Sequence, residues 1–283
     1  MRLAFIGFTD LAGVEADARF AATHGFEGLE YNYWGDFKHL TLEAVTAMRR
    51  TLDAHGVRAS ALGLWGWNHL APDPAEREEA HVMLGRAIDF AQTLGAEVLI
   101  AGGGVVTEEA IEPNVEEFAR VFPPFLDRMA AAGLTPAMYA VHGNSFFDCI
   151  EAYEQVWERF PQVGIKFDPA NWRHHGDDYL AILRDHGDKV SYVHIKEHLY
   201  MRSSGTRSQL DASELGHVPE FELAAQPAAG MGDIEWGKVM AFLYEHDYRG
   251  YLSFEPHGSK WAREPLRTRM LLLSRKYLEQ FLL

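Results

Sequence analysis

Short hydrophobic runs alternate with longer stretches of helical periodicity along the whole chain. The runs that predict β-strands are Leu3–Phe8, Gly28–Tyr33, Ala59–Leu64, Val98–Ala101, Pro136–Val141, Gly164–Phe167, Ser191–Ile195 and Tyr251–Phe254. The predicted helices begin near Leu11, Thr41, Pro74, Val115, Asp148, Asp178, Ile234 and Pro265. Strands separated by helices of this length pair in parallel through right-handed crossovers. Eight such units predict a closed (β/α)8 TIM barrel, built as one domain over residues 1–283.

One connection is longer than this pattern requires. The segment 199–232 separates the seventh predicted strand from the helix near Ile234, whereas connections in such folds usually have about 2–6 residues. Because it follows a strand, it belongs to the mouth of the barrel, where long loops often act as lids. We expect a mouth loop that closes over the site, with a surface excursion for oligomer contacts as the alternative.

Charge and composition narrow the class of protein. The net charge of −15 argues against a nucleic-acid partner, because such binding depends on many Lys and Arg contacts with phosphates. Cys149 is the single cysteine, which excludes an internal disulfide and is typical of a reducing compartment. No apolar run approaches the ~18 residues of a membrane span, and the N-terminus has no signal-peptide h-region. We therefore expect a cytoplasmic protein with no membrane partner.

Three polar residues stand where consecutive predicted strands end. Asp168 follows the sixth strand, His194 lies near the end of the seventh, and Glu255 follows the eighth. Since side chains alternate across a strand, the same parity directs all three into the barrel at its mouth. Two buried carboxylates need a compensating positive charge, and with an imidazole they suit a divalent metal ion.

The alternative to a metal site is an internal salt-bridge cluster. In that interpretation Lys166 and Lys196 neutralise the carboxylates. Glu30 on the second strand also points inward, so a buried Lys166–Glu30 pair would be purely structural.

Several short motifs follow one another along the chain in a particular order. They are Gly25–Glu30, Leu94–Ala96, Asp168–Asn171, Val193–Lys196, Gly232–Ile234 and Tyr248–Glu255. In this order the chain resembles the sugar phosphate isomerase/epimerase superfamily of xylose isomerase-like barrels. The resemblance implies a manganese, magnesium, cobalt or zinc ion held by a Glu, an Asp, a His and a Glu from strands five to eight. It assigns the last three ligands to Asp168, His194 and Glu255.

The fifth strand departs from the family pattern. The family commonly has a Glu two residues before a His, and this chain has Ala140 before His142. We expect His142, with inward parity, to be the fourth metal ligand. The alternative is that His142 contacts only the substrate or a neighbouring side chain.

The resemblance implies a metal-dependent isomerase or epimerase acting on a small sugar or sugar derivative. A metal bound to a substrate carbonyl and hydroxyl favours an enediolate, and a carboxylate moves the neighbouring proton. Glu255 is the expected base, Lys196 the stabiliser of negative charge, and His142 a partner. Because the family's epimerases often use both glutamates, Ala140 leaves two alternatives open: a keto-sugar lyase or dehydratase, and a non-catalytic sugar-binding subunit. The acidic charge disfavours an apurinic endonuclease of the same barrel type.

Other residues near the mouth are expected to contact substrate. Trp65 and Trp67 follow the third strand and offer aromatic faces to a sugar, with ordinary packing beneath the loops as the alternative. Asn171, His257 and Arg202 are the remaining substrate-binding candidates. The chain has no dedicated phosphate cradle, which favours an unphosphorylated ligand. A homo-oligomer is common in such families.

Overall fold

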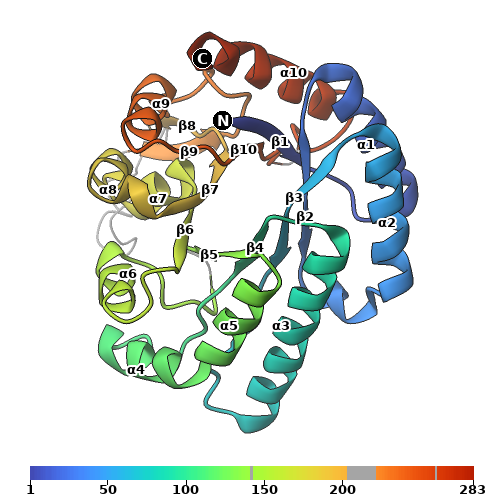
Figure 1. Ribbon diagram of the computed structural model, residues 1–283. Coiled ribbons are helices and arrows are strands. Elements are labelled where there is room, and N and C mark those ends of the chain that lie inside the picture. Colours follow the sequence, from blue (N-terminus) through green and yellow to red (C-terminus); the bar gives the residue numbers. More distant parts are fainter. Residues whose placement is uncertain (141–142, 203–220, 259) are drawn as a thin grey trace, which may run out of the picture.

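The computed structural model describes residues 1–140, 143–202, 221–258 and 260–283. Eight parallel strands close into a barrel in the order β1-β10-β7-β6-β5-β4-β3-β2, and helices surround it (Figure 1). This architecture confirms the predicted single-domain (β/α)8 barrel. Among the described residues, none of the helices has both the length and the apolar character needed to span a membrane.

The barrel strands are β1 (Arg2–Ile6), β2 (Gly28–Tyr33), β3 (Arg58–Leu64), β4 (Val98–Ala101), β5 (Thr135–Tyr139), β6 (Gly164–Phe167), β7 (Val190–Ile195) and β10 (Tyr251–Phe254). The α-helices are α1 (Leu11–His24), α2 (Leu42–His55), α3 (Pro74–Leu94), α4 (Ile111–Val121), α5 (Pro123–Ala131), α6 (Ile150–Trp157), α7 (Pro169–His175), α8 (Tyr179–His186), α9 (Trp236–Glu245) and α10 (Leu266–Leu278). The described residues also form the short 3-10 helices η1 (Gly35–His39), η2 (Gly187–Lys189) and η3 (Glu279–Phe281).

Each predicted strand corresponds to an observed barrel strand, because short apolar runs between helices have few other ways to be buried. The observed helices differ from the predicted helices more than the strands do. The region predicted as one helix near Val115 forms two, since Pro123 cannot donate a backbone N–H inside a helix but fits the first turn of α5. A further short helix, α7, starts at Pro169 directly after the sixth strand.

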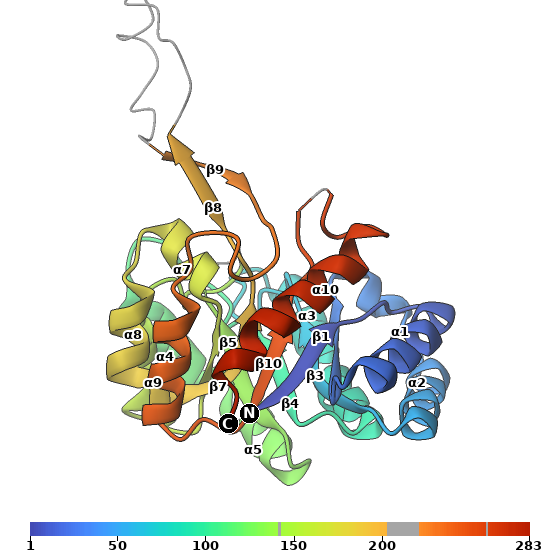
Figure 2. The same ribbon diagram turned by 90° about the horizontal axis from the view of Figure 1, so that it is seen from above.

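The segment 199–232 is not wholly a loop. Its described parts contain β8 (Leu199–Arg202) and β9 (Phe221–Ala225), which pair in antiparallel register. Figure 2 shows this pair projecting from the barrel on the side toward which the barrel strands run. Residues 203–220 lie outside the described part, so the predicted lid remains a prediction.

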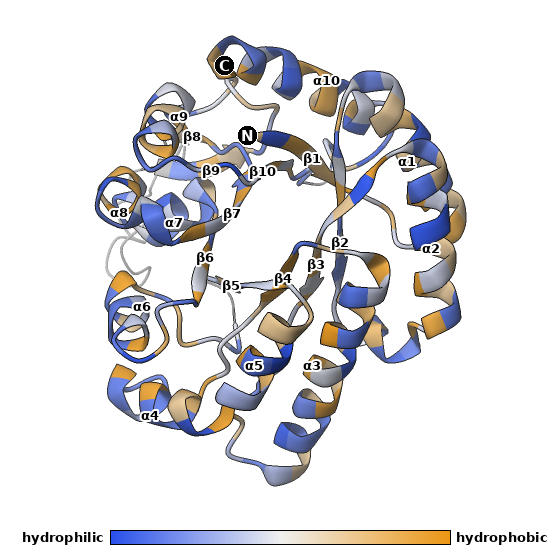
Figure 3. Ribbon diagram, viewed as in Figure 1, coloured by the Kyte–Doolittle hydropathy of each residue, from blue (hydrophilic) through white to orange (hydrophobic). Residues whose placement is uncertain are grey.

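Hydrophobic side chains form two layers, one inside the barrel and one between the strands and the helices. Figure 3 shows helices with both hydrophobic and hydrophilic stripes, as expected for helices with one buried face. The smaller inner cluster contains Ala4, Ala61, Trp65, Val98, Ile100, Ala137, Tyr139, Tyr192 and Tyr251.

The inner cluster corrects the expected parity at the end of strand five. Tyr139 belongs to the inner layer, whereas Ala140 packs in the layer outside the barrel. The parity that was expected to direct His142 inward would direct Ala140 inward as well, and Ala140 does not follow it. The reason is that the alternation of β5 is set by its pairing, which places Tyr139 beside the inward-facing Lys166. His142 lies outside the described residues, so its role as a ligand remains a prediction.

A buried ion pair joins the first and last helices. Arg267 on α10 places its Nη1 and Nη2 at 2.9 and 3.0 Å from the two carboxylate oxygens of Asp17 on α1. Asp17 also accepts a hydrogen bond from the backbone N of Phe8 at 2.8 Å, and Arg267 donates to the carbonyl of Ile6 at 3.2 Å. The pair therefore anchors the end of β1 where the barrel closes.

We expect Arg267→Met to lower the free energy of unfolding by about 3–5 kcal/mol, because it leaves the buried Asp17 carboxylate without its partner. Urea denaturation measures the change. The control is Arg249→Met, since the Arg249–Asp247 pair is largely exposed, at 72% and 84%, and should contribute less than about 1 kcal/mol. If both variants lost the same free energy of unfolding, the buried Arg267–Asp17 pair would not have the stabilising role assigned to it.

Candidate metal-binding site

Asp168 owes its orientation to the junction between β6 and α7. One carboxylate oxygen, Oδ1, accepts a hydrogen bond from the backbone N of Asn171 at 3.1 Å and so caps α7. Pro169 then occupies the first helical turn, which needs no backbone donor there. The other oxygen, Oδ2, is left to face the barrel, where Lys166 Nζ lies 3.1 Å away.

His194 and Glu255 complete a compact group with Asp168. His194 Nδ1 lies 2.8 Å from Glu255 Oε2 and 3.7 Å from Asp168 Oδ2. The backbone N of Glu255 donates to the carbonyl of Ile195, which holds the end of β10 beside β7. One ligand atom from each of the three residues lies within 4.8 Å of the others. The predicted convergence is therefore confirmed, and two oxygens with one imidazole nitrogen suit manganese, magnesium, cobalt or zinc.

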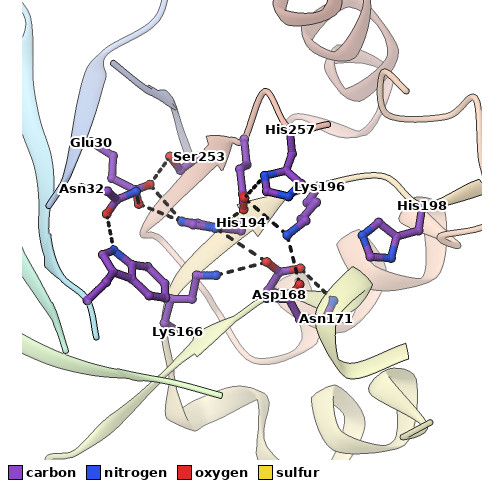
Figure 4. Close-up of polar contacts among 12 residues, drawn as sticks. Glu30, Asn32, Lys166, Asp168, Asn171, His194, Lys196, His198, Ser253 and His257 are labelled. Carbon is purple, nitrogen blue, oxygen red and sulfur yellow. Dashed lines mark hydrogen bonds and ion pairs between the residues drawn. The ribbon is translucent and has the colours of Figure 1, made fainter. Parts of the chain in front are cut away.

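Glu30 fixes the orientation of the His194 ring. Its two carboxylate oxygens lie 2.9 and 3.0 Å from His194 Nε2, and Ser253 Oγ donates to the same carboxylate at 2.6 Å (Figure 4). Asn32 Nδ2 adds a further hydrogen bond at 2.7 Å. With Nε2–H directed to Glu30, Nδ1 is the nitrogen that can bind a metal. Glu30 thus pairs with His194 and Lys166 pairs with Asp168, so the predicted Lys166–Glu30 pair is wrong.

Lysines balance the negative charge of the group. Lys196 Nζ lies 3.3 Å from Glu255 Oε1 and donates to Asn171 Oδ1 at 3.1 Å. Burial raises the pKa of the Asp168 carboxyl, but Lys166 and Lys196 more than offset this and hold it well below its usual range. Burial likewise opposes ionisation of Glu255, yet Lys196 and His194 lower the pKa of that carboxyl. Both carboxylates are therefore ionised at neutral pH.

His194 carries the third positive charge when no ion is bound. Burial by itself lowers the pKa of the imidazole, but the charge of Glu30 and the hydrogen bonds to Asp168 and Glu255 raise it to about 10. The Glu30 carboxyl responds in the opposite direction: burial raises its pKa, and the charge of His194 lowers it overall. Three carboxylates thus face two lysines and one imidazolium, so the buried charges of these six groups are balanced.

A cavity of about 500 Å³ opens onto this group at the mouth of the barrel. Its described lining includes the predicted residues Trp65, His194, Lys196, Glu255 and His257. Such a volume suits a small-molecule ligand.

The other predicted substrate residues are placed as follows. Asn171 is near the cavity through its hydrogen bond with Lys196. Trp67 is half-buried against the core with Lys38 over its ring, 5.3 Å from the centroid, and does not occur in the described lining. Arg202 ends β8, and its side chain lies outside the described part.

The lining also contains Phe8, Asn32, Trp34 and Lys166, which were not among the predicted substrate-binding residues. The signal for two of them was available on the second strand. Glu30, Asn32 and Trp34 alternate at a spacing of two, so the inward parity of Glu30 extends to the mouth. Phe8 has no such signal because it follows the end of β1.

A closed parallel barrel with two carboxylates and an imidazole at the ends of its strands is an arrangement typical of metal-dependent barrel enzymes. The family model described as xylose isomerase-like TIM barrel matches residues 18–275. The chain therefore belongs to this superfamily of sugar isomerases and epimerases.

Relatives that are similar in sequence are named as dehydratases and not as isomerases or epimerases. An inosose dehydratase from Clostridium perfringens is 21% identical over 251 residues, covering 83% of this chain and 81% of the relative. An inosose dehydratase from Halalkalibacterium halodurans is 26% identical over 121 residues, covering 43% and 38%.

Solved structures of similar fold include several epimerases. The D-allulose 3-epimerase from Methylomonas sp. in complex with D-allulose has a TM-score of 0.73 at 17% identity, covering 100% of this chain and 97% of that one. An L-ribulose 3-epimerase has a TM-score of 0.75 at 15% identity, covering 99% and 94%. The IOLI protein with a bound zinc atom has a TM-score of 0.74 at 16% identity, covering 99% and 98%. At these identities the likeness shows the fold alone.

We expect Glu30→Gln to weaken Mn²⁺ binding by about 10- to 100-fold, because the neutral amide orients His194 less firmly and does not enhance its basicity. Isothermal titration calorimetry on the metal-free protein measures the affinity. Glu97→Gln is the control, since Glu97 pairs with Arg2 away from the cavity lining. A Glu30 variant that binds Mn²⁺ as tightly as the control would refute this role.

Metal uptake should release about one proton at pH 7, because Nδ1 of His194 must lose its proton before it can bind an ion. Since the pKa of His194 is about 10 in the metal-free protein, Mn²⁺ affinity should rise as the pH increases toward that value. Calorimetry in two buffers with different ionisation enthalpies counts the proton. A heat of binding that does not depend on the buffer would rule out this linkage.

Proposed function

We propose that the chain is a divalent-metal-dependent isomerase or epimerase of an unphosphorylated keto-sugar or related polyhydroxy ketone. The observation that carries the proposal is the convergence of Asp168, His194 and Glu255 beside a cavity large enough for such a ligand. These residues would hold the ion, with His142 as the expected fourth ligand and manganese as the expected metal. A bound ion would act as a Lewis acid that polarises the substrate carbonyl and hydroxyl.

Glu255 is the proposed base. Its carboxyl is ionised at neutral pH, and its Oε1 lies at the cavity beside Lys196 and His257, at 3.3 and 3.1 Å. An ionised carboxylate in this position can remove the proton from the carbon next to the carbonyl, which gives an enediolate. Return of the proton at a different atom, or on the other face, gives an isomer or an epimer.

Lys196 is the proposed stabiliser of the negative charge that develops on the substrate. Burial lowers the pKa of the ammonium, but Glu255 and Asp168 raise it overall, so the group stays charged. Its contacts with Glu255 and Asn171 keep it at the cavity wall. A fixed cation in a largely dry site stabilises a developing oxyanion more strongly than water does.

A dehydratase is the second candidate. Tyr139, rather than a carboxylate, faces inward at the described end of β5, so a second carboxylate base of the epimerase type is not supplied there. A single base suffices for a dehydration, because the proton that it removes next to the carbonyl can be passed to the hydroxyl group on the neighbouring carbon, which then leaves as water. The names of the relatives from Clostridium perfringens and Halalkalibacterium halodurans support the same reaction class.

The two reactions and a non-catalytic role are separable in one assay. The Mn²⁺-loaded protein is incubated in D₂O with D-fructose, D-allulose, D-tagatose and inososes. NMR follows deuterium at carbon, and mass spectrometry follows the loss of water. Exchange without a change in formula indicates an isomerase or epimerase, whereas loss of water indicates a dehydratase. Sugar binding without any exchange or water loss would favour the non-catalytic subunit.

We expect Glu255→Gln to reduce exchange by about 10²- to 10⁴-fold, because the amide cannot accept the proton. The exposed Glu76→Gln is the matched control and should leave the rate unchanged. Circular dichroism checks that both variants are folded, and calorimetry checks that they retain Mn²⁺. A folded, Mn²⁺-loaded Glu255 variant that exchanges at the normal rate would show that another residue is the base.

A further inference from the structure

Trp34 is a large apolar side chain left exposed inside the mouth. It follows β2, has 55% of its surface exposed, and lines the cavity above the metal-binding group. Its indole packs nearly parallel to Trp65, with centroids 5.9 Å apart and planes at 19°. Trp65 is itself stacked on Tyr139 at 4.4 Å and 13° and is nearly buried. Trp34 is thus the accessible end of a stack of three aromatic rings.

The stack holds Trp34 in one orientation. The backbone N of Trp34 donates to Asp36 Oδ1 at 2.9 Å, and its carbonyl accepts from Phe37 N at 3.0 Å where η1 begins. Trp65 Nε1 donates to Asn32 Oδ1 at 2.8 Å. Asn32 in turn donates to Glu30, the partner of His194, as Figure 4 shows. The aromatic wall and the metal-binding histidine therefore share one hydrogen-bonded network.

The lining of the cavity combines apolar and charged side chains. Phe8, Trp34 and Pro256 supply apolar surface, and Phe8 is also well exposed, at 43%. Lys196 and Glu255 supply charged groups. Exposed aromatic side chains in a concave site are typical of ligand contact, because burying them against the ligand removes apolar surface from water.

We propose that Trp34 determines substrate specificity by stacking against the C–H face of a polyhydroxylated ligand in ring form. A rigid ring presents a flat face of C–H groups to the indole and leaves its hydroxyls free to meet the charged groups of the lining. An open chain would first have to be ordered, which costs binding free energy. This inference rests on the proposed function only in taking a polyhydroxylated molecule as the ligand.

Binding of two unreactive probes tests the proposal without any turnover. Methyl β-D-glucopyranoside is locked as a ring, and D-glucitol is an open chain with similar hydroxyl groups. Saturation-transfer NMR on the Mg²⁺-loaded protein gives the dissociation constant of each probe. We expect the ring probe to bind more tightly and Trp34→Ala to weaken it by about 3- to 10-fold, the worth of one aromatic contact. Trp34→Phe should recover part of the affinity.

The matched control is Leu42→Ala, which removes an equally exposed apolar side chain, at 56%, that does not belong to the described lining of the cavity. It should leave both affinities unchanged. The proposal is overturned if the ring probe does not bind, if D-glucitol binds as tightly, or if Trp34→Ala binds the ring probe normally. The proposed function is tested separately, by deuterium exchange. If the protein turns over substrate but Trp34→Ala binds the ring probe normally, only this inference is refuted. If binding of the ring probe depends on Trp34 but no turnover occurs, only the proposed function is refuted.

Discussion

The site depends on the cost of burying like charges. Glu30, Asp168 and Glu255 bring three carboxylates to one end of the barrel, where Glu30 and Asp168 have almost no contact with solvent. Each buried charge needs a partner of opposite sign, because its lost hydration is not otherwise recovered. Lys166, Lys196 and the protonated His194 supply three such partners. The same arrangement keeps the ligand atoms close together, since each carboxylate is held in place by a cation or a donor.

His194 connects this charge balance to the barrel itself. Its Nε2 contacts Glu30 on β2 across the interior, and its Nδ1 contacts Glu255 after β10. Three strands far apart in the sequence therefore meet at one imidazole. Because the ring is bonded on both nitrogens, Nδ1 would have to lose its proton before it could hold a metal ion, and the contact of Nε2 with Glu30 could remain.

The inward direction of Tyr139 determines which groups the end of β5 brings to the site, as the acidic residues do on the other strands. Its ring fills the inward position at the end of β5 and supports Trp65, which supports Trp34. A carboxylate there would give the site a second base, whereas the tyrosine gives it an aromatic wall. The site thus combines charged groups with aromatic surface, a combination that fits a ligand with both polar and C–H surfaces.

The sequence by itself determined the barrel and the three strand-end residues Asp168, His194 and Glu255. Both follow from local patterns: apolar runs alternate with helical periods, and side-chain parity repeats every two residues. Only the tertiary structure decided the partner of each charge and the inward residue of strand five. Those depend on the register between strands and on contacts across the barrel, as in the Glu30–His194 pair, whose members are 164 positions apart. No local period carries that information, because packing in three dimensions selects one pairing among several that the parity allows.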